Sequence, residues 1–505
     1  MVTADRKKKN YKLFFEPCTI VSVFNAAGLQ QKKVSTEMSK NINKEENFGK
    51  NINRRDVLKC GLYGLAGLSS GLYVTGCAKP AKIERPNIIL IVLDTTRLDH
   101  LSCYGYHRNT SPNLDRLADE SVLYTQAIAP SSWTLPSHAS LFTGKFTSSH
   151  GARYDSNGPL RLVNVIKGPE DWNKVRARGL SQNEVTLASI LNQTGYLTGA
   201  VVGGPWLKKV FGLNKGFEYY DDNDIGTLNG RSADQVTAAA LRWIEESRNK
   251  EFFLFLNYFD PHYPYDPPDD FVTPFFQKNP QIFYQLSQLE QIIASYDGEI
   301  LYMDYHIGKL LENLKANNLY DNSMIIVTAD HGESLSEHGK IGHGDYLWQE
   351  EIHVPLFIKH PAGEVSSRQS NLRIQLTDIL PLICKRLGLA IPEDIQGDVP
   401  PEIKHPIVAE TYPLKALVKD GSWRAILERD YKFLWNSENN HKLFHLRNDP
   451  AEQFNLIEKK PQVAARMLSN MERYLADLPK PYPVSAEQEV DEDTKKALES
   501  LGYIK

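Results

Sequence analysis

Cysteine is scarce in this chain, with five among 505 residues. Three of them, Cys18, Cys60 and Cys77, precede the first predicted strand, so only Cys103 and Cys384 remain for the body of the protein. This number excludes a disulfide framework and a cysteine metal site. With 41% hydrophobic residues, the chain can instead bury a large core, as one large domain or as a large and a small one.

An excess of charge of one sign is also missing, because the formal net charge is −4. Binding to nucleic acid usually requires a clustered basic surface. The composition therefore predicts no nucleic acid partner and argues against the binding of polyanions.

No apolar run near the start is long enough to span a bilayer comfortably. Residues 53–59 (NRRDVLK) resemble a twin-arginine export signature, and the glycine-rich apolar stretch of residues 60–76 follows. Residues 74–77 (VTGC) resemble a lipoprotein-processing site. We therefore predict a leader over residues 1–76 and a lipid on Cys77 that anchors an exported periplasmic or cell-surface protein to a membrane. The alternative is a basic stretch followed by a buried helix.

From residue 85 onward, short apolar runs alternate with helical patterns. The runs are expected to be strands at residues 87–93, 198–202, 252–258 and 324–328. This order predicts an α/β fold over residues 85–400, with a mostly parallel central sheet flanked by helices. Ligands gather beyond the carboxyl ends of such strands, where the sequence places Asp94, residues 260–262, Asp330 and His331.

Shorter strand patterns at residues 423–428 and 431–435, and a helix over residues 461–478, predict a smaller α+β subdomain over residues 401–480. A polar tail is expected over residues 481–505.

A long amphipathic helix is predicted over residues 287–317. For its acidic residues Asp297, Glu299 and Asp304, a solvated or structural role is favoured over a catalytic one.

Two segments carry residues suited to chemistry. Asp330 and His331 follow a strand, His338 and His343 lie in the glycine-rich loop after them, and Asp94 ends a neighbouring strand, which is typical of a metal site. The alternative is a polar loop that happens to contain histidines. Residues 131–144 predict a loop that enters a helix, where Thr134 would lie among backbone amides that attract anions; an ordinary helix cap is the alternative.

These segments resemble the sulfatase family, in the alkaline phosphatase superfamily, in order and in spacing. The resemblance implies an alkaline-phosphatase-like fold from residue 85 onward. The matching segments are residues 94–100 (DTTRLDH), 103–105, 111–115, 134–138 (TLPSH), 296–304, 328–332 (TADHG), 354–356 and 443–456.

The sequence departs from the sulfatase pattern at several positions. Thr95 and His331 stand where sulfatases have Asp and Asn. Residues 203–208 (GGPWLK) lack the lysine and the histidine that the family has at the aligned positions. Thr134 replaces the Cys or Ser that sulfatases oxidise to formylglycine, an aldehyde that threonine cannot yield. These departures favour phosphoryl transfer over sulfate chemistry.

The motif around Asp330 also resembles phosphoethanolamine transferases, which use a threonine nucleophile. That likeness implies metal binding by Asp94, Thr134, Asp330 and His331, with His262 and His343 on a second metal or on the ester oxygens. His138 takes the place of the family's arginine and is expected to orient Thr134. We predict Thr134, His138, His262 and His343 as catalytic residues, and the substrate-binding set as Arg97, His262, Lys340 and His343.

The sequence thus predicts an exported, metal-dependent hydrolase that cleaves a phosphate or sulfate ester of a small molecule or glycan through Thr134. Zn²⁺ or Mn²⁺ suits these oxygen and imidazole ligands best, with Ca²⁺ or Mg²⁺ as alternatives. The alternative functions are a true sulfatase acting on sulfated glycans, a transferase of the phosphoethanolamine type, and a binding module without turnover.

Overall fold

The computed structural model describes residues 84–161, 175–226, 229–275, 287–362, 364, 368–413 and 420–483. The predicted leader, the lipidation site Cys77 and nearly all of the predicted tail lie outside these residues.

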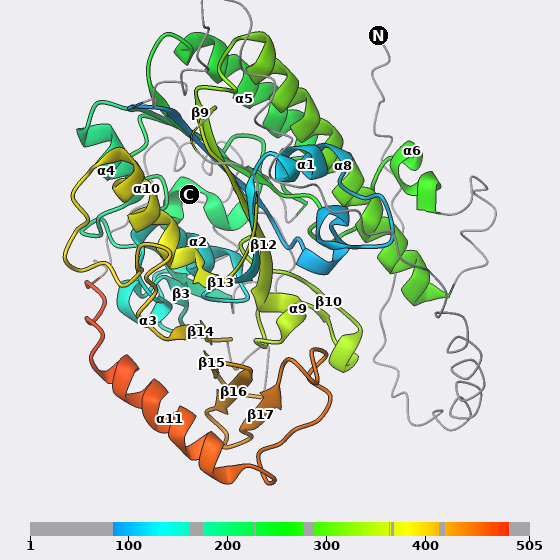
Figure 1. Ribbon diagram of the computed structural model, residues 1–505, viewed down its shortest axis with the longest axis vertical. Helices are drawn as coiled ribbons and strands as arrows, with labels where there is room; N and C mark the ends of the chain where they lie inside the picture. Colours follow the sequence, from blue (N-terminus) through cyan, green and yellow to red (C-terminus); the bar gives the residue numbers. More distant parts are fainter. Residues whose placement is uncertain are drawn as a thin grey trace, which may run out of the picture. The chain divides into compact units, whose positions relative to one another are not determined.

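A sheet of eight strands forms the centre of the protein, in the order β13-β2-β12-β9-β1-β8-β6-β7 (Figure 1). All pair in parallel except β12, which runs against both of its neighbours. The predicted mostly parallel sheet is therefore confirmed. Its strands are β1 (Asn87–Leu93), β2 (Val122–Ile128), β6 (Leu197–Val201), β7 (Tyr219–Asp221), β8 (Phe252–Tyr258), β9 (Ser323–Thr328), β12 (His353–Lys359) and β13 (Arg368–Gln375).

The unbroken apolar runs of β1 and β8 explain their place at the centre of the sheet. Every residue of both strands is buried, as expected for parallel strands that are covered on both faces. The observed bounds of β1 and β8 agree with the predicted ones. Strand β6 is shifted by one residue toward the N-terminus, and β9 begins one residue earlier than predicted.

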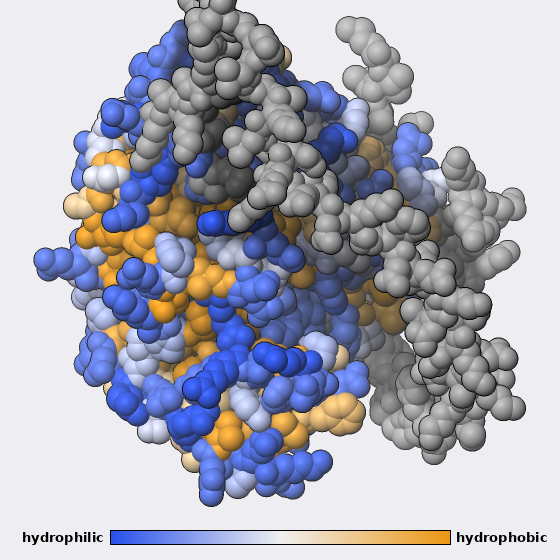
Figure 2. All heavy atoms as spheres, in the orientation of Figure 1, coloured by the Kyte–Doolittle hydropathy of each residue, from blue (hydrophilic) through white to orange (hydrophobic). Residues whose placement is uncertain are grey.

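Helices form two groups around the sheet in Figure 1, one with α1, α5 and α8 and the other with α2, α4 and α10. Figure 2 shows apolar side chains gathered on the left of the same view, in the region of α4 and α10, and mostly hydrophilic ones over the C-terminal subdomain. The helices are α1 (Pro112–Asp119), α2 (Thr134–Thr143), α3 (Thr147–His150), α4 (Leu187–Gln193), α5 (Ala233–Ser247), α6 (Asp269–Val272), α8 (Gln288–Ala316), α9 (Gln349–Ile352), α10 (Ile379–Leu387) and α11 (Pro461–Ala476).

Helix α8 confirms the long predicted helix, but its acidic residues are not solvated. Asp297, Glu299 and Asp304 are all buried. Both oxygens of Asp304 accept hydrogen bonds from backbone amides in the first turn of α1. Solvation is therefore wrong and the structural role holds. Asp297 and Asp304 tie the segment after β1 to α8, and Glu299 accepts from the backbone amide of Asp266 in the segment after β8.

The C-terminal subdomain is an antiparallel sheet of four strands with one helix: β14 (Ile407–Thr411), β15 (Trp423–Glu428), β16 (Tyr431–Asn436), β17 (Lys442–His445) and α11. Trp423 and Leu434 belong to the main core, whereas Ile426 and Phe433 pack with Met467 of α11. This small sheet is therefore sandwiched between the main core and its own helix.

Two smaller sheets complete the described fold. They consist of β3 (Arg153–Tyr154), β5 (Arg176–Arg178) and β4 (Leu160–Arg161), and of β10 (Ser334–Leu335) with β11 (Ile341–Gly342). Among the described residues, no helix is long and apolar enough to cross a membrane.

Candidate functional site

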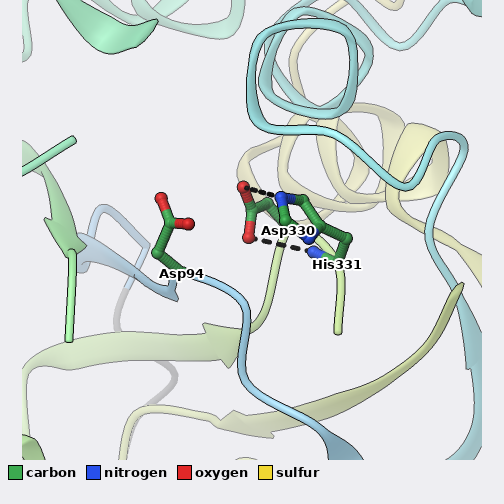
Figure 3. Close-up of side chains that lie close together, drawn as sticks. All are labelled: Asp94, Asp330 and His331. Carbon is green, nitrogen blue, oxygen red and sulfur yellow. Dashed lines mark hydrogen bonds and ion pairs between the residues drawn. The ribbon is translucent and has the colours of Figure 1, made fainter. Parts of the chain in front are cut away.

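The carboxyl ends of β1 and β9 bring three predicted metal ligands together. Asp94 follows β1, and Asp330 and His331 lie just beyond β9, its parallel neighbour. One ligand atom from each of the three lies within 4.8 Å of the other two. In Figure 3, Asp330 and His331 lie side by side and Asp94 lies opposite them.

Asp94 is held by a residue that the sequence interpretation missed. The side-chain nitrogen of Asn257 donates to Oδ2 of Asp94 at 3.2 Å, and its Oδ1 accepts from the backbone amides of Gly203 and Gly204. A Cβ added to Gly204 would lie 3.3 Å from Oδ2 of Asp94. The only signal for Asn257 was a single amide in the apolar run of β8.

The carboxylate of Asp330 is fixed by backbone amides. Its Oδ1 accepts from the amide of His331 at 2.9 Å and from that of Thr95 at 3.3 Å. Thr95 has a φ of 52°, and its carbonyl accepts a hydrogen bond from the hydroxyl of Tyr296 at 2.7 Å. Thr95, where sulfatases have Asp, thus supports Asp330 through its backbone.

The imidazole of His331 is oriented by its own loop. Its Nδ1 lies 2.9 Å from the carbonyl of Gly332 and donates to it, which leaves the lone pair of Nε2 for the site. That Nε2 lies 3.4 Å from Oδ2 of Asp330 and 3.3 Å from Oγ1 of Thr134. The structure therefore brings all four predicted metal ligands together.

The electrostatics of this cluster fit a bound cation. Asp94 and Asp330 are fully buried, and Oδ1 of the first and Oδ2 of the second have no hydrogen-bond partner among the described residues. Burial and the nearby charge of Asp330 raise the pKa of Asp94, and burial raises the pKa of Asp330 to about 7. Burial also lowers the pKa of His331. Two buried carboxylates and a neutral imidazole are the groups that a divalent metal ion stabilises.

Thr134 is the first residue of α2 and is buried. The preceding Trp133 is extended, so the chain turns into the helix at the candidate nucleophile, as predicted. Within the same turn, the hydroxyl of Ser137 donates to the carbonyl of Asp330 at 2.6 Å. This bond holds the start of α2 against the end of β9.

His138 is buried, like every other residue of α2. Its Nδ1 is 2.9 Å from the carbonyl oxygen of Thr134, and its ring contacts Phe142 and Phe255 edge to face. Burial lowers the pKa of His138 to about 4, so the neutral ring donates to that carbonyl. In this geometry His138 supports the backbone of Thr134 and does not contact its hydroxyl.

His262 and His343 lie beside His331. The ring centroids of His331 and His343 are 4.4 Å apart, and those of His262 and His343 are 5.1 Å apart. Nδ1 of His343 lies 2.8 Å from Glu333, which also accepts from the hydroxyl of Tyr265 at 2.9 Å. Glu333 had no role in the sequence interpretation, although it follows His331 by only two positions.

The other predicted residues have different neighbours. The guanidinium of Arg97 pairs with Asp99 and Glu337 and lines a cavity of about 940 Å³ beside the C-terminal subdomain. Lys340 is exposed, with its ammonium 5.6 Å from the centre of the Tyr346 ring. His338 stacks on Trp348, with ring centroids 3.9 Å apart. The structure does not place these three among the metal ligands, and substrate binding by Arg97 and Lys340 stays a prediction.

Comparison with known proteins agrees with this geometry. A sulfatase family model matches residues 86–389. The chain is 21% identical over 428 residues to the uncharacterized sulfatase YidJ of Escherichia coli, covering 74% of this chain and 84% of that protein. It is 25% identical over 404 residues to an ulvan-active sulfatase of Formosa agariphila, covering 74% and 78%.

Solved structures share the fold. The phosphonate monoester hydrolase of Agrobacterium radiobacter matches with a TM-score of 0.61 at 20% identity, over 77% of this chain and 96% of that one. A protein solved with its substrate D-glucosamine-2-N,6-O-disulfate matches with a TM-score of 0.62 at 18% identity, over 80% and 100%. Since the family model covers more than half of the sequence, the chain belongs to the sulfatase family of the alkaline phosphatase superfamily and is an ester hydrolase of that family.

Proposed function

We propose that this protein is a metal-dependent hydrolase that cleaves phosphate or sulfate esters of glycans, with Thr134 as the nucleophile. The observation that carries the proposal is the 3.3 Å distance between Oγ1 of Thr134 and Nε2 of His331, beside the buried carboxylates of Asp94 and Asp330.

Asp94, Thr134, Asp330 and His331 would hold one divalent ion, with Zn²⁺ or Mn²⁺ favoured by the oxygen and imidazole donors. A bound ion would supply Lewis acidity and neutralise charge on the ester oxygens. Asn257 and the backbone amide of Thr95 orient the two carboxylates for that role.

Thr134 begins the reaction by giving up its hydroxyl proton and forming a bond from Oγ1 to the phosphorus or sulfur of the ester. The bond from that atom to the alcohol oxygen of the substrate breaks, and the alcohol leaves with a proton. Water then cleaves the ester on Thr134 and restores the hydroxyl. The first turn of α2 presents the backbone amides of Thr134 and Leu135, which favour the anionic group.

His262 and His343 are the groups proposed to bind the ester oxygens and to protonate the departing alcohol. They flank His331 on one side of the site, and Glu333 fixes the ring of His343. An imidazole held by a carboxylate is suited to donate a proton from its other nitrogen.

The identity of the nucleophile favours phosphate over sulfate. A threonine cannot form an aldehyde hydrate, so a sulfate ester on Thr134 would have no elimination route and would break slowly. A phosphate ester on Thr134 can be cleaved by attack of water at phosphorus. A true sulfatase is the second candidate, because relatives at 25% and 21% identity are an ulvan-active sulfatase and an N-acetylglucosamine-6-O-sulfatase. The same relatives support a glycan as the alcohol part of the substrate.

The location of the enzyme is part of the proposal. A twin-arginine leader and a lipid on Cys77 would place the catalytic domain outside the cytoplasm on a membrane anchor. Labelling of cells with a radioactive fatty acid should mark the native chain and leave the Cys77→Ser variant unlabelled. A labelled Cys77→Ser protein would contradict the proposed anchor.

The test of the chemistry is an assay of the protein, loaded with Zn²⁺ or Mn²⁺, on an aryl phosphate monoester, an aryl phosphate diester and an aryl sulfate. We expect faster turnover of a phosphate ester than of the sulfate ester. Thr134→Ala should lower kcat by at least about 10³-fold. Mass spectrometry of the acid-quenched enzyme should find phosphate on the peptide that contains Thr134.

Thr143→Ala is the matched control, since it removes a buried hydroxyl from the far end of the same helix. This variant should keep its turnover. Faster cleavage of the sulfate ester would favour the second candidate, and full activity of Thr134→Ala would exclude Thr134 as the nucleophile.

A further inference from the structure

The small sheet β3-β5-β4 carries four arginines in direct register. Arg153 lies opposite Arg178 in one strand pair, and Arg161 lies opposite Arg176 in the other. Residues that are directly opposite share a face of a sheet, as do residues two positions apart in one strand. All four side chains therefore leave the same face, which we term the arginine face.

The other face of this sheet points into the protein. Ala177 and Leu160 are 1% and 7% exposed. The ring of Tyr154 stacks on Trp133, with ring centroids 3.6 Å apart. The arginine face is therefore turned away from the core; Arg161 is exposed and the other three are half-buried.

Like charges directly opposite each other destabilise a strand pair. Among the described residues, one ion pair offsets them, between Arg178 and Asp155 at 3.3 Å. Arg176 donates to the backbone carbonyl of Gly158, which leaves its charge in place. Four positive charges therefore lie on one small sheet of a chain whose formal net charge is −4. The overall composition does not explain this cluster.

Two connections tie the sheet β3-β5-β4 to the candidate active site, one from its inner face and one from the arginine face. Tyr154 of β3 stacks on Trp133, the residue before Thr134, and β3 lies near α2 in Figure 1. On the other side, the guanidinium of Arg153 lies 4.1 Å from the centre of the Tyr412 ring. The neighbouring Thr411 donates from its hydroxyl to the carbonyl of Gly344, the residue after His343. The inner face of the sheet therefore packs against the residue before Thr134, and the arginine face adjoins the site only along the edge formed by Arg153, Tyr412 and Thr411.

We propose that the arginine face is a subsite for further anionic groups of the substrate, which is a glycan chain with several sulfate or phosphate esters. The proposal rests on the proposed function, since one ester of the chain occupies the metal site while its neighbours bind the arginines. Guanidinium groups fit tetrahedral oxyanions with paired hydrogen bonds. The net charge of the whole chain argued against a polyanionic ligand. A net charge does not reveal a local cluster of arginines such as this one.

The test measures equilibrium binding to the metal-loaded full chain by fluorescence anisotropy, with labelled dextran sulfate, phosphorylated dextran, neutral dextran and a polynucleotide of matched charge. We expect the two anionic dextrans to bind and neutral dextran not to bind. Replacement of all four arginines by Gln should weaken dextran sulfate binding at least tenfold and reduce its salt dependence. Replacement by Lys should preserve more of the affinity.

The matched control replaces four exposed arginines elsewhere by Gln, namely Arg242, Arg248, Arg466 and Arg473. Equal weakening in this control, or none in the arginine-face variant, would overturn the subsite. Equally tight binding of the polynucleotide would overturn the assignment to a glycan. If the fourfold variant fails to fold, the single change Arg161→Gln should still weaken binding at least twofold.

Binding and chemistry fail independently in these experiments. If the arginine face is not a subsite, its replacement leaves the affinity for dextran sulfate unchanged. If Thr134 is not the nucleophile, the Thr134→Ala variant keeps its turnover.

Discussion

The side chain of Asn257 donates a hydrogen bond to Asp94 at 3.2 Å, from one central strand to the end of the next. Because its carbonyl oxygen is held by two backbone amides, Asn257 can present only its nitrogen to the carboxylate. We expect Asn257→Ala to weaken metal binding by about 10- to 100-fold, as is usual for residues that orient a ligand. A titration of the metal-free protein with Zn²⁺, followed by activity, measures this effect.

The control for this variant is Asn183→Ala, which removes an exposed amide. It should leave the metal affinity unchanged. An unaltered affinity in Asn257→Ala would show that Asp94 needs no support from Asn257 to bind the metal.

Removal of the metal should reveal the cost of the two buried carboxylates. Burial and the charge of Asp330 raise the pKa of Asp94, so its ionised form destabilises the metal-free fold at pH 8. In the presence of a chelator, Asp94→Asn should therefore raise Tm above that of the native protein. With excess metal the order should reverse, because the variant has lost a ligand.

Asp119→Asn, a change of the same kind at an exposed position, should shift Tm little under either condition. If Asp94→Asn lowers Tm with chelator as well as with metal, the crowding of carboxylates does not destabilise the metal-free protein.

Asp297 of α8 should contribute to stability and not to chemistry. Its two oxygens accept from His100 at 2.7 Å, from the hydroxyl of Tyr106 at 2.9 Å and from Arg108 at 2.7 Å. Removal of one partner from such a buried network typically costs about 3 kcal/mol. Urea unfolding of Asp297→Ala should show a loss of this size, whereas Asp270→Ala, at an exposed position, should show almost none. A loss of activity without a loss of stability would contradict this structural role.

The sequence predicted that the candidate metal ligands Asp94 and Asp330 lie close together, because parallel strands end at a common edge. Asp94 and Asp330 each follow an apolar run, so the α/β pattern alone places them together. Thr134 was found through the family resemblance and the helix start. These residues are defined by local pattern and by order along the chain.

The supporting residues were missed because their roles depend on contacts between distant segments. Asn257 is distinguished only by its polarity within an apolar strand, and its partner Asp94 lies 163 positions away. The acidic residues of α8 were expected to be solvated or structural, because the sequence does not show which segments contact them. Asp297 and Asp304 face the segment after β1, and Glu299 faces the segment after β8. The arginine face needs the register of three short strands, which no periodicity in the sequence reveals.

The pair of His405 and Asp378 should make stability depend on pH. Nε2 of His405 lies 2.7 Å from Oδ1 of Asp378, and its Nδ1 lies 2.9 Å from the carbonyl of Pro406, so both ring nitrogens can donate. Burial lowers the pKa of His405, but the carboxylate of Asp378 outweighs it and the net pKa is raised. The stabilisation is therefore complete below the pKa of an unfolded histidine and is lost as the pH rises through the raised value.

With metal in excess, the difference in Tm between native protein and His405→Gln should be largest near pH 6 and should shrink by pH 9. His107→Gln, at an exposed position, should show no such trend, and a constant difference for His405→Gln would mean that the ring packs there without its charge.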